Sequence, residues 1–326
     1  MCYDSNSILN SPKTVPKVFW TITILSIFIH IFGAFCILQK TPKSVKSVRF
    51  WLFNFHLWSL LLDFVLGFAI TPFFFLPTLT FRAFGFLEGF ERIVPYLVVL
   101  VLAGTGYSLV FLLENRYNCL KILEFSKWRK TFRVIFYVAN TVFLFAFPLI
   151  SVVYVPDQKL GRIQAIQLLP CLAEIPDFFV VVTDKTQVKN IVLVIFLTVF
   201  IIVFQSIFFA WSIIRISDFS KNISKHTIAL QRKFIKSILI QKLIPSASLL
   251  PPIFYIFLCI FTTFHWQKLT NLSIFLVNLH GIIGSAAMLF LHKTYKNTVI
   301  DLVYCRRQIN GTPMEVNNYW VKSLPS

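Results

Sequence analysis

Seven long apolar stretches recur along the chain, and shorter polar segments separate them. Each stretch supplies roughly the 20 apolar residues that a helix needs to cross the hydrocarbon core of a bilayer. Inside that core every backbone polar group must be bonded internally, which a helix achieves by itself. The pattern therefore predicts an all-α membrane protein, a bundle of seven transmembrane helices at residues 18–38, 50–74, 94–113, 134–155, 191–214, 243–264 and 272–291.

The basic residues between the spans gather on one side of the predicted membrane. With the amino end outside, the inner segments hold 22 of the 31 lysine and arginine residues, and the outer segments hold nine. Cytoplasmic loops carry such an excess of positive charge. We therefore expect residues 1–17 to be extracellular, residues 18–292 to form the bundle and residues 293–326 to be a cytoplasmic tail, with no β-domain or globular module. Seven helices in this orientation outline a G-protein-coupled receptor.

The composition excludes several classes of protein. A hydrophobic fraction of 57%, a mean hydropathy of +0.75 and only 13% charged residues do not suit a soluble globular protein. The formal net charge of +18 would suit nucleic-acid binding, but +17 of it lies in the inner segments. A positive surface on that side faces the anionic lipids of the inner leaflet. The lipid bilayer is therefore the expected partner, and nucleic acid is not.

Asp63 is the one acidic residue deep inside a predicted span. An ionisable side chain at that depth is costly, so it should face the interior of the bundle. From the helical rise we expect Asp63 at the level of Asn278, and His56 near Ser285 one layer further in. At helical spacing, two stripes carry these residues: His56, Ser59, Asp63 and Gly67 in the second span, and Asn278, Ser285 and His292 in the seventh.

These stripes allow two interpretations. The side chains form a polar switch or an ion site that connects an outer ligand pocket to the inner surface. Alternatively, they form a hydrogen-bonded structural core with no switching role. The sixth span is the best candidate for a hinge, because Pro245, Pro251 and Pro252 each remove a backbone donor, although a static bend would satisfy the same pattern.

The third span ends in the tetrapeptide Glu114-Asn115-Arg116-Tyr117. Rhodopsin-like receptors keep an acid–arginine–tyrosine switch at this place, and here Asn115 stands between the acid and the arginine. We interpret the tetrapeptide as a G-protein-coupling switch, with Glu114 and Arg116 close to the basic ends of the fifth and sixth helices. An interfacial charge pair that only marks the end of the helix is the alternative interpretation.

The inner segments contain two further features. Residues 215–242 mix basic and apolar side chains as an amphipathic extension of the fifth and sixth helices, which can contact a heterotrimeric G protein or lipid headgroups. Residues 295–309 resemble a short interfacial helix, and Cys305 within it is a candidate palmitoylation site. Both features suit a cytoplasmic surface.

The cysteines and histidines indicate neither a metal site nor an enzyme. The six cysteines include no C-x-x-C pair, and the six histidines show no H-E-x-x-H spacing. Asp63 also lacks the second intramembrane carboxylate that an aspartyl protease needs, so we expect no metal, no cofactor and no catalytic residue. Cys2 and Cys171 alone fall on the oxidising outer side, which makes them a candidate disulfide between the amino segment and the second outer loop.

Several residue strings match one receptor family. They are His30 to Pro42, Asn54 to Ser59 followed by Asp63, Glu114 to Tyr117, Leu169 to Cys171, Gln241 with Pro245, and His292 to Tyr295. With these strings, spread over nearly the whole chain, the sequence resembles the nematode serpentine chemoreceptors of class H. It departs from them at Thr294, where the family usually has proline. The resemblance implies a receptor that detects small environmental molecules in the membrane of chemosensory neurons or their cilia.

The leading functional prediction is a receptor that binds a small-molecule ligand in the outer half of the bundle. A membrane transporter or a ligand-gated channel is the alternative from another class. Insect-type odorant channels also have seven spans, but they place the amino end inside, contrary to the charge distribution in this chain. The side on which the amino end lies therefore distinguishes the two functions.

Overall fold

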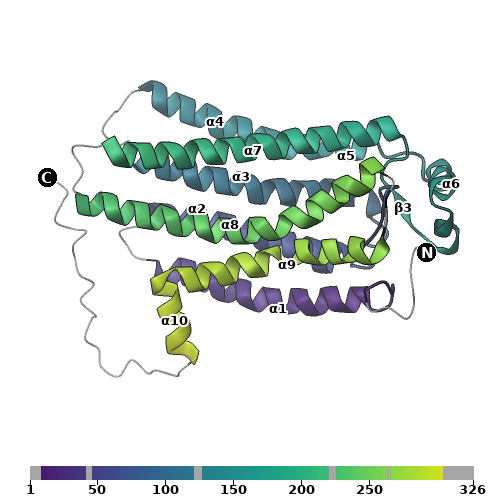
Figure 1. Cartoon of the computed structure of the whole chain (residues 1–326), viewed down its shortest axis with the longest axis horizontal. Coiled ribbons are helices and arrows are strands. Elements are labelled where there is room, and N and C mark those ends of the chain that lie inside the picture. Colours follow the sequence, from purple (N-terminus) through teal and green to yellow (C-terminus); the bar gives the residue numbers. More distant parts are fainter. Residues whose placement is uncertain are drawn as a thin grey trace.

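The computed structural model describes residues 9–41, 46–120, 127–219, 225–262, 264 and 266–303. In this part of the chain, long helices run side by side and form one elongated bundle (Figure 1). Short turns extend three of them: η1 (Cys36–Lys40) continues α1, η3 (Val65–Ile70) continues α2, and η5 (Phe147–Leu149) with α5 (Ile150–Val153) continues α4. The bundle helices are α1 (Val15–Phe35), α2 (Lys46–Phe64), α3 (Val94–Leu120), α4 (Lys127–Ala146), α7 (Lys185–Phe219), α8 (Lys225–Thr262) and α9 (Gln267–Leu291).

Six of the described helices are long and apolar enough to cross a membrane. The seventh is α8, which has a shorter apolar part at Ala247–Thr262. The predicted seven-helix membrane bundle is therefore confirmed. Helix α8 stays helical through Pro245, Pro251 and Pro252 and changes direction along its length in Figure 1. The hinge in this helix stays a prediction.

The second helix is shorter than we predicted. We expected it to reach residue 74, but it ends at Ile70, and Pro72–Phe75 form a strand. Thr71 has a φ of 46°, in the left-handed region, and the proline that follows disfavours a helical conformation at Thr71. Phe73 and Phe75 are both buried. This phenylalanine run therefore packs inside the protein and does not continue the helix toward lipid.

A small antiparallel sheet and a short helix cover one end of the bundle, which we call the sheet end. Strand β1 (Pro72–Phe75) pairs with β2 (Thr80–Ala83), and β2 pairs with β3 (Phe179–Val180). The connecting segments also contain α6 (Gln158–Leu168), η4 (Glu91–Ile93) and η6 (Pro170–Glu174). Both groups of the Gln158 amide bond the backbone of Val180 at 3.0 Å and so join α6 to β3. Sequence analysis predicted no β-domain, and it did not anticipate these short strands within the connecting segments.

An apolar cluster fixes the sheet and α6 on the bundle. The rings of Phe19 and Phe275 stack within it, with centroids 4.4 Å apart. Two side-chain amides of α9 add hydrogen bonds to this end of the bundle. Gln267 donates to the carbonyl of Phe74 at 2.7 Å, and Asn271 donates to that of Leu9 at 2.8 Å. The sheet end is therefore closed by a packed cap. Its buried apolar members are Val15, Phe19, Phe73, Phe75, Ala165, Leu169, Leu172, Ile175, Phe178, Val180, Ile274 and Phe275.

At the opposite end, helix α10 (Lys293–Val303) leaves the bundle at a steep angle (Figure 1). Its Tyr295 is buried, and the hydroxyl lies 2.7 Å from Oγ1 of Thr41, just beyond the end of η1. Burial raises the pKa of Tyr295 above its ordinary value. We predicted a short helix from 295 to 309. The helix found here begins two residues earlier, and the residues after 303, including Cys305, lie outside the described part.

Candidate functional site

A buried carboxylate joins three helices inside the bundle. Asp63 on α2 is 1% exposed. Its oxygens accept hydrogen bonds from the hydroxyl of Ser26 on α1 at 2.6 Å and from the backbone N–H of Gly281 on α9 at 3.2 Å. A third partner is Nε2 of His30 on α1, at 3.0 Å. Asp63 therefore faces inward, toward polar groups, as the cost of an acid at this depth requires.

His30 is the central residue that sequence analysis did not select. Its Nδ1 lies 3.2 Å from the hydroxyl of Ser285 and 3.4 Å from Nε2 of His56. The same Nε2 of His56 donates to the backbone carbonyl of His30 at 2.9 Å. One imidazole on α1 thus connects Asp63 and His56 of α2 with Ser285 of α9. We call the group Ser26, His30, His56, Asp63, Gly281 and Ser285 the polar cluster.

A signal for His30 was present in the sequence. The buried positions of α1 include Ser26, His30 and Gly33, which follow each other at spacings of four and three residues. This is the spacing of one helix face. The first span was treated only as an apolar run, and His30 entered only within a string that matches a receptor family. Reading its small and polar residues as a stripe would have placed His30 opposite Asp63.

Two glycines permit the close approach of the cluster side chains. An alanine Cβ at Gly281 would lie 2.3 Å from Oδ2 of Asp63, and one at Gly33 would lie 2.7 Å from Cε1 of His56. Real Cβ contacts are essentially never this short. The carboxylate therefore rests on the backbone of α9, and the imidazole of His56 rests on the backbone of α1.

Asn278 lies about one turn away from the place that we predicted. We expected it at the level of Asp63, but the carboxylate contacts Gly281 instead. The Asn278 amide lies beside Gly67, whose Cβ would come within 3.0 Å of it. The side chain is 0% exposed, and neither its Nδ2 nor its Oδ1 has a hydrogen-bond partner among the described residues. Asn278 thus faces Gly67, one helical turn from the contact between Asp63 and Gly281.

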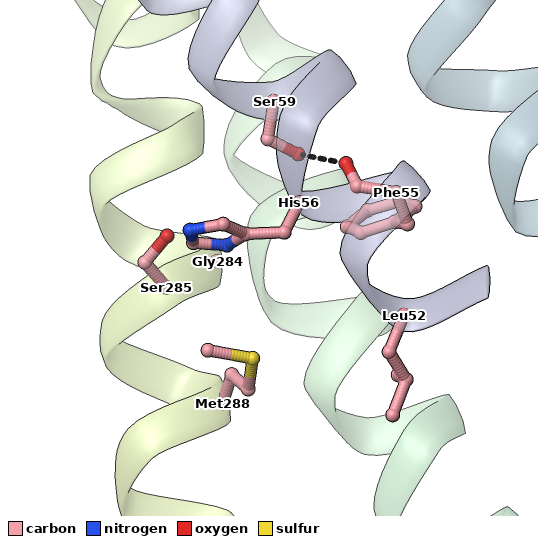
Figure 2. Close-up of a pocket in the computed structure, with 7 residues that line it drawn as sticks. All are labelled: Leu52, Phe55, His56, Ser59, Gly284, Ser285 and Met288. Carbon is pink, nitrogen blue, oxygen red and sulfur yellow. Dashed lines mark hydrogen bonds between the residues drawn. The ribbon is translucent and has the colours of Figure 1, made fainter. Parts of the chain in front are cut away.

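His56 and Ser285 share the second layer, where a small cavity lies between α2 and α9 (Figure 2). Figure 2 shows the His56 ring extending from α2 toward Ser285, with Met288 one turn further along α9. The hydroxyl of Ser59 donates to the carbonyl of Phe55 at 3.2 Å. The cavity volume of about 10 Å³ is near the minimum for one buried water. Its lining residues are Leu52, Phe55, His56, Ser59, Gly284, Ser285 and Met288.

At the end opposite the sheet, Glu114 pairs with helix four. Its carboxylate lies 3.0 Å from Nε of Arg133, and it accepts a short hydrogen bond from the hydroxyl of Tyr137. The Tyr137 ring stacks on Trp51 of α2, with centroids 5.3 Å apart and an interplanar angle of 18°. We had placed Glu114 near the fifth and sixth helices, and the structure corrects this. The charge on α4 attracts the acid, and sequence analysis overlooked both Arg133 and Tyr137.

The other members of the tetrapeptide face different neighbours. Asn115 accepts a hydrogen bond from Arg133 at 3.3 Å. The ring of Tyr117 lies 5.7 Å from that of Phe209 on α7, so this residue faces the fifth helix of the bundle. Arg116 is one position earlier on α3, and its side chain is largely covered. The acid and the arginine of the tetrapeptide therefore belong to different parts of the helix surface.

Cys171 in η6 is disulfide-bonded, whereas Cys36, Cys119 and Cys259 form no disulfide in the described part of the chain. Cys2 lies outside the described residues, so its pairing with Cys171 stays a prediction. We expect a peptide map of the unreduced protein to contain one cross-linked fragment with Cys2 and Cys171. Replacement of Cys171 with serine should then destabilise the cap, typically by about 2–5 kcal/mol. An unmodified thiol at Cys2 would contradict the pairing.

The match with known proteins extends over both sites. The family described as serpentine type 7TM GPCR chemoreceptor Srh matches residues 10–305, which include the polar cluster and the tetrapeptide. The chain is also 26% identical over 295 residues to Serpentine receptor class H-72 of Caenorhabditis elegans, a match that covers 84% of this chain and 81% of that protein. A multi-pass bundle with these matches is a receptor of the G-protein-coupled type. The chain belongs to the Srh family of serpentine seven-transmembrane chemoreceptors.

Proposed function

We propose that this chemoreceptor binds a small environmental molecule in the half of the bundle nearer the sheet end and signals to a heterotrimeric G protein at the opposite end. The distribution of basic residues supports the orientation, because 22 of the 31 face the proposed cytoplasm. The family supports the receptor class. The proposed location is the plasma membrane of chemosensory neurons or their cilia.

The observation that carries the proposal is the polar cluster. A carboxylate bonded to α1 and α9 at 2.6–3.2 Å makes the packing of three helices depend on one charged group. A ligand that moves α9 relative to α2 would alter these hydrogen bonds. In a core of apolar side chains, the packing of the helices would not depend on a single charged group. A ligand shifts an equilibrium only through its different affinity for two states, and we propose that these hydrogen bonds are kept in one state and broken in the other.

Asp63→Asn tests this switching role. Asparagine keeps the shape and most hydrogen bonds but removes the charge, so we expect the variant to fold and reach the cell surface. Its half-maximal ligand concentration should change by about fivefold or more, the lower range of ordinary coupling between sites. An unchanged response at matched surface expression would make the cluster a structural core. Thr198→Val, a change at a buried hydroxyl on α7 outside the cluster, is the matched control.

The function itself is tested by expression of the receptor in a cell with a calcium or cAMP reporter. A panel of volatile and water-soluble compounds should include a ligand that produces a response lost in cells without the receptor. An epitope tag on the amino end should be accessible to antibody in intact cells. A tag that becomes accessible only after permeabilisation would contradict the orientation and favour the channel alternative.

A further inference from the structure

Arg82 lies on the central strand of the small sheet with one of its donors unused. Strand β2 pairs with β1 on one side and with β3 on the other, so Arg82 belongs to the interior of the sheet. The side chain is partly exposed, but its Nε is buried and donates to no acceptor among the described residues. A buried donor without a partner costs free energy, and the cost is larger for a charged group. An acceptor from outside the chain would remove that cost.

Aromatic rings surround this guanidinium. The Cζ of Arg82 lies 5.0 Å from the centroid of the Phe84 ring. Its partner across on β1 is Phe73, a member of the apolar cluster of the cap. On the other side, the register of β2 and β3 places Phe178 opposite Arg82 when it is continued by one residue. A guanidinium that stacks on a ring keeps its edge free for hydrogen bonds.

A second arginine reaches the same part of the sheet from α6. Nε of Arg162 donates to the carbonyl of Phe178 at 3.0 Å, and its Cζ lies 5.6 Å from the centroid of that ring. Gln158, four residues earlier on the same face of α6, bonds the backbone of Val180 and holds the helix on β3. The sheet and α6 thus bring two guanidinium groups, those of Arg82 and Arg162, to the neighbourhood of Phe178.

These two arginines form no ion pair with an acid in the described part of the chain. Nearby acids are bonded elsewhere, because Asp157 accepts from backbone N–H groups at the start of α6 and Glu91 accepts from that of Gly89. Asp177 is next to Phe178 in sequence, but it is exposed and pairs with neither arginine. The two positive charges repel each other, and a bound anion would reverse the sign of that interaction.

We propose that Arg82 and Arg162 form a binding site for the carboxylate of a small organic acid at the surface of the cap. Arginine binds a planar oxyanion through two parallel N–H bonds, and the unused Nε of Arg82 is one such donor. The apolar part of the acid lies against the ring of Phe84. The proposal deepens the proposed receptor function by naming the chemical class of the ligand, whereas the binding itself does not depend on signalling.

The site is connected to the polar cluster through two helices. The apolar cluster of the cap includes Phe19 of α1 and Phe275 of α9, whose rings stack. Further along the same helices, Ser26 and Gly281 both donate to the carboxylate of Asp63. A ligand that moves the cap therefore acts on the two helices that hold this carboxylate.

The test is binding of 4-fluorobenzoate to the full chain in phosphatidylcholine nanodiscs, followed by ¹⁹F NMR. The amide 4-fluorobenzamide has nearly the same shape without the charge, and we expect it to bind much more weakly than the acid. Arg82→Gln and Arg162→Gln should each weaken binding of the acid by about tenfold or more, the usual loss for a hydrogen bond to a charged group. Arg82→Lys should also bind weakly, since lysine keeps the charge but lacks the planar fork. Arg92→Gln, at an exposed arginine of η4 at the same end, is the matched control and should bind as the wild type does.

Equal binding of the acid and the amide overturns the proposal, as does unchanged affinity in Arg82→Gln. Should Arg82→Gln fail to fold, Arg82→Lys and Arg162→Gln provide the same test. Nanodiscs that also contain phosphatidylglycerol distinguish a lipid headgroup from a free acid. We expect no displacement of the acid by this lipid, because β2 is the central strand, and displacement would assign the site to lipid. Binding of the acid without any reporter response in cells supports the anion site and contradicts its role in the proposed signalling.

Discussion

Gly281→Ala is expected to remove most of the receptor from the cell surface. The new Cβ would lie 2.3 Å from Oδ2 and 2.4 Å from Oδ1 of Asp63, so the carboxylate must move. Movement lengthens its bonds to Ser26 and His30, the first of which is 2.6 Å long. Loss of a partner by a buried charge costs about 3–5 kcal/mol. We expect a lower thermal unfolding temperature in detergent and a large loss of surface antibody signal.

A second substitution separates this clash from a general effect of alanine on α9. Alanine favours a helix by about 1 kcal/mol over glycine, so any loss must come from contacts in the folded receptor. Asp63→Ala removes the carboxylate that the new Cβ meets. The double variant should therefore lose less stability than the sum of the two single variants, a coupling that neighbouring residues show and distant ones do not. Additive losses would mean that Gly281 and Asp63 do not interact as the structure has them.

The inward direction of Asp63 was predictable from sequence, because the free-energy cost of a carboxylate that faces lipid decides it. The register of α2 against α9 was not, since it depends on where each helix begins and on the turn η3 that ends α2. An offset of three residues replaced the predicted contact with Asn278 by one with Gly281. A glycine gives no polar signal in a sequence, although it contributes a backbone N–H and the space for a carboxylate.

The sheet and the Glu114 ion pair show a different limit of sequence analysis. The apolar run that ends in Phe75 has the composition of a membrane span, and only Thr71 and Pro72 indicate that the helix stops before it. Glu114 has a cation two residues away at Arg116, yet it pairs with Arg133, which is 19 residues away in sequence. Partners on another helix depend on how α3 and α4 pack, and the charge pattern of one helix does not contain that information.

Arg116→Ala is expected to abolish most signalling while the receptor still reaches the surface. Glu114 has its ion pair with Arg133 and a hydrogen bond from Tyr137, so loss of Arg116 leaves that buried acid bonded. We propose that the guanidinium at position 116, which is largely covered in this structure, becomes accessible when a ligand binds and then contacts the G protein at the end opposite the sheet. Removal of such a charged contact typically costs about 2–5 kcal/mol, which exceeds a tenfold loss of coupling. The measurement is ligand-induced reporter output at matched surface expression.

Arg133→Ala is the matched control, because it removes the other arginine near Glu114 and should have the opposite effect. Without Arg133 the Glu114 carboxylate keeps only its hydrogen bond from the Tyr137 hydroxyl. The Tyr137 ring, which stacks on Trp51, also loses the guanidinium beside it. The variant should therefore be retained inside the cell, while the fraction that reaches the surface still signals. Tyr137→Phe should weaken delivery in the same direction and by less. Normal reporter output from Arg116→Ala would mean that the tetrapeptide only anchors the end of the helix. An equal loss of surface signal in Arg116→Ala and Arg133→Ala would mean that Arg116 contributes to folding.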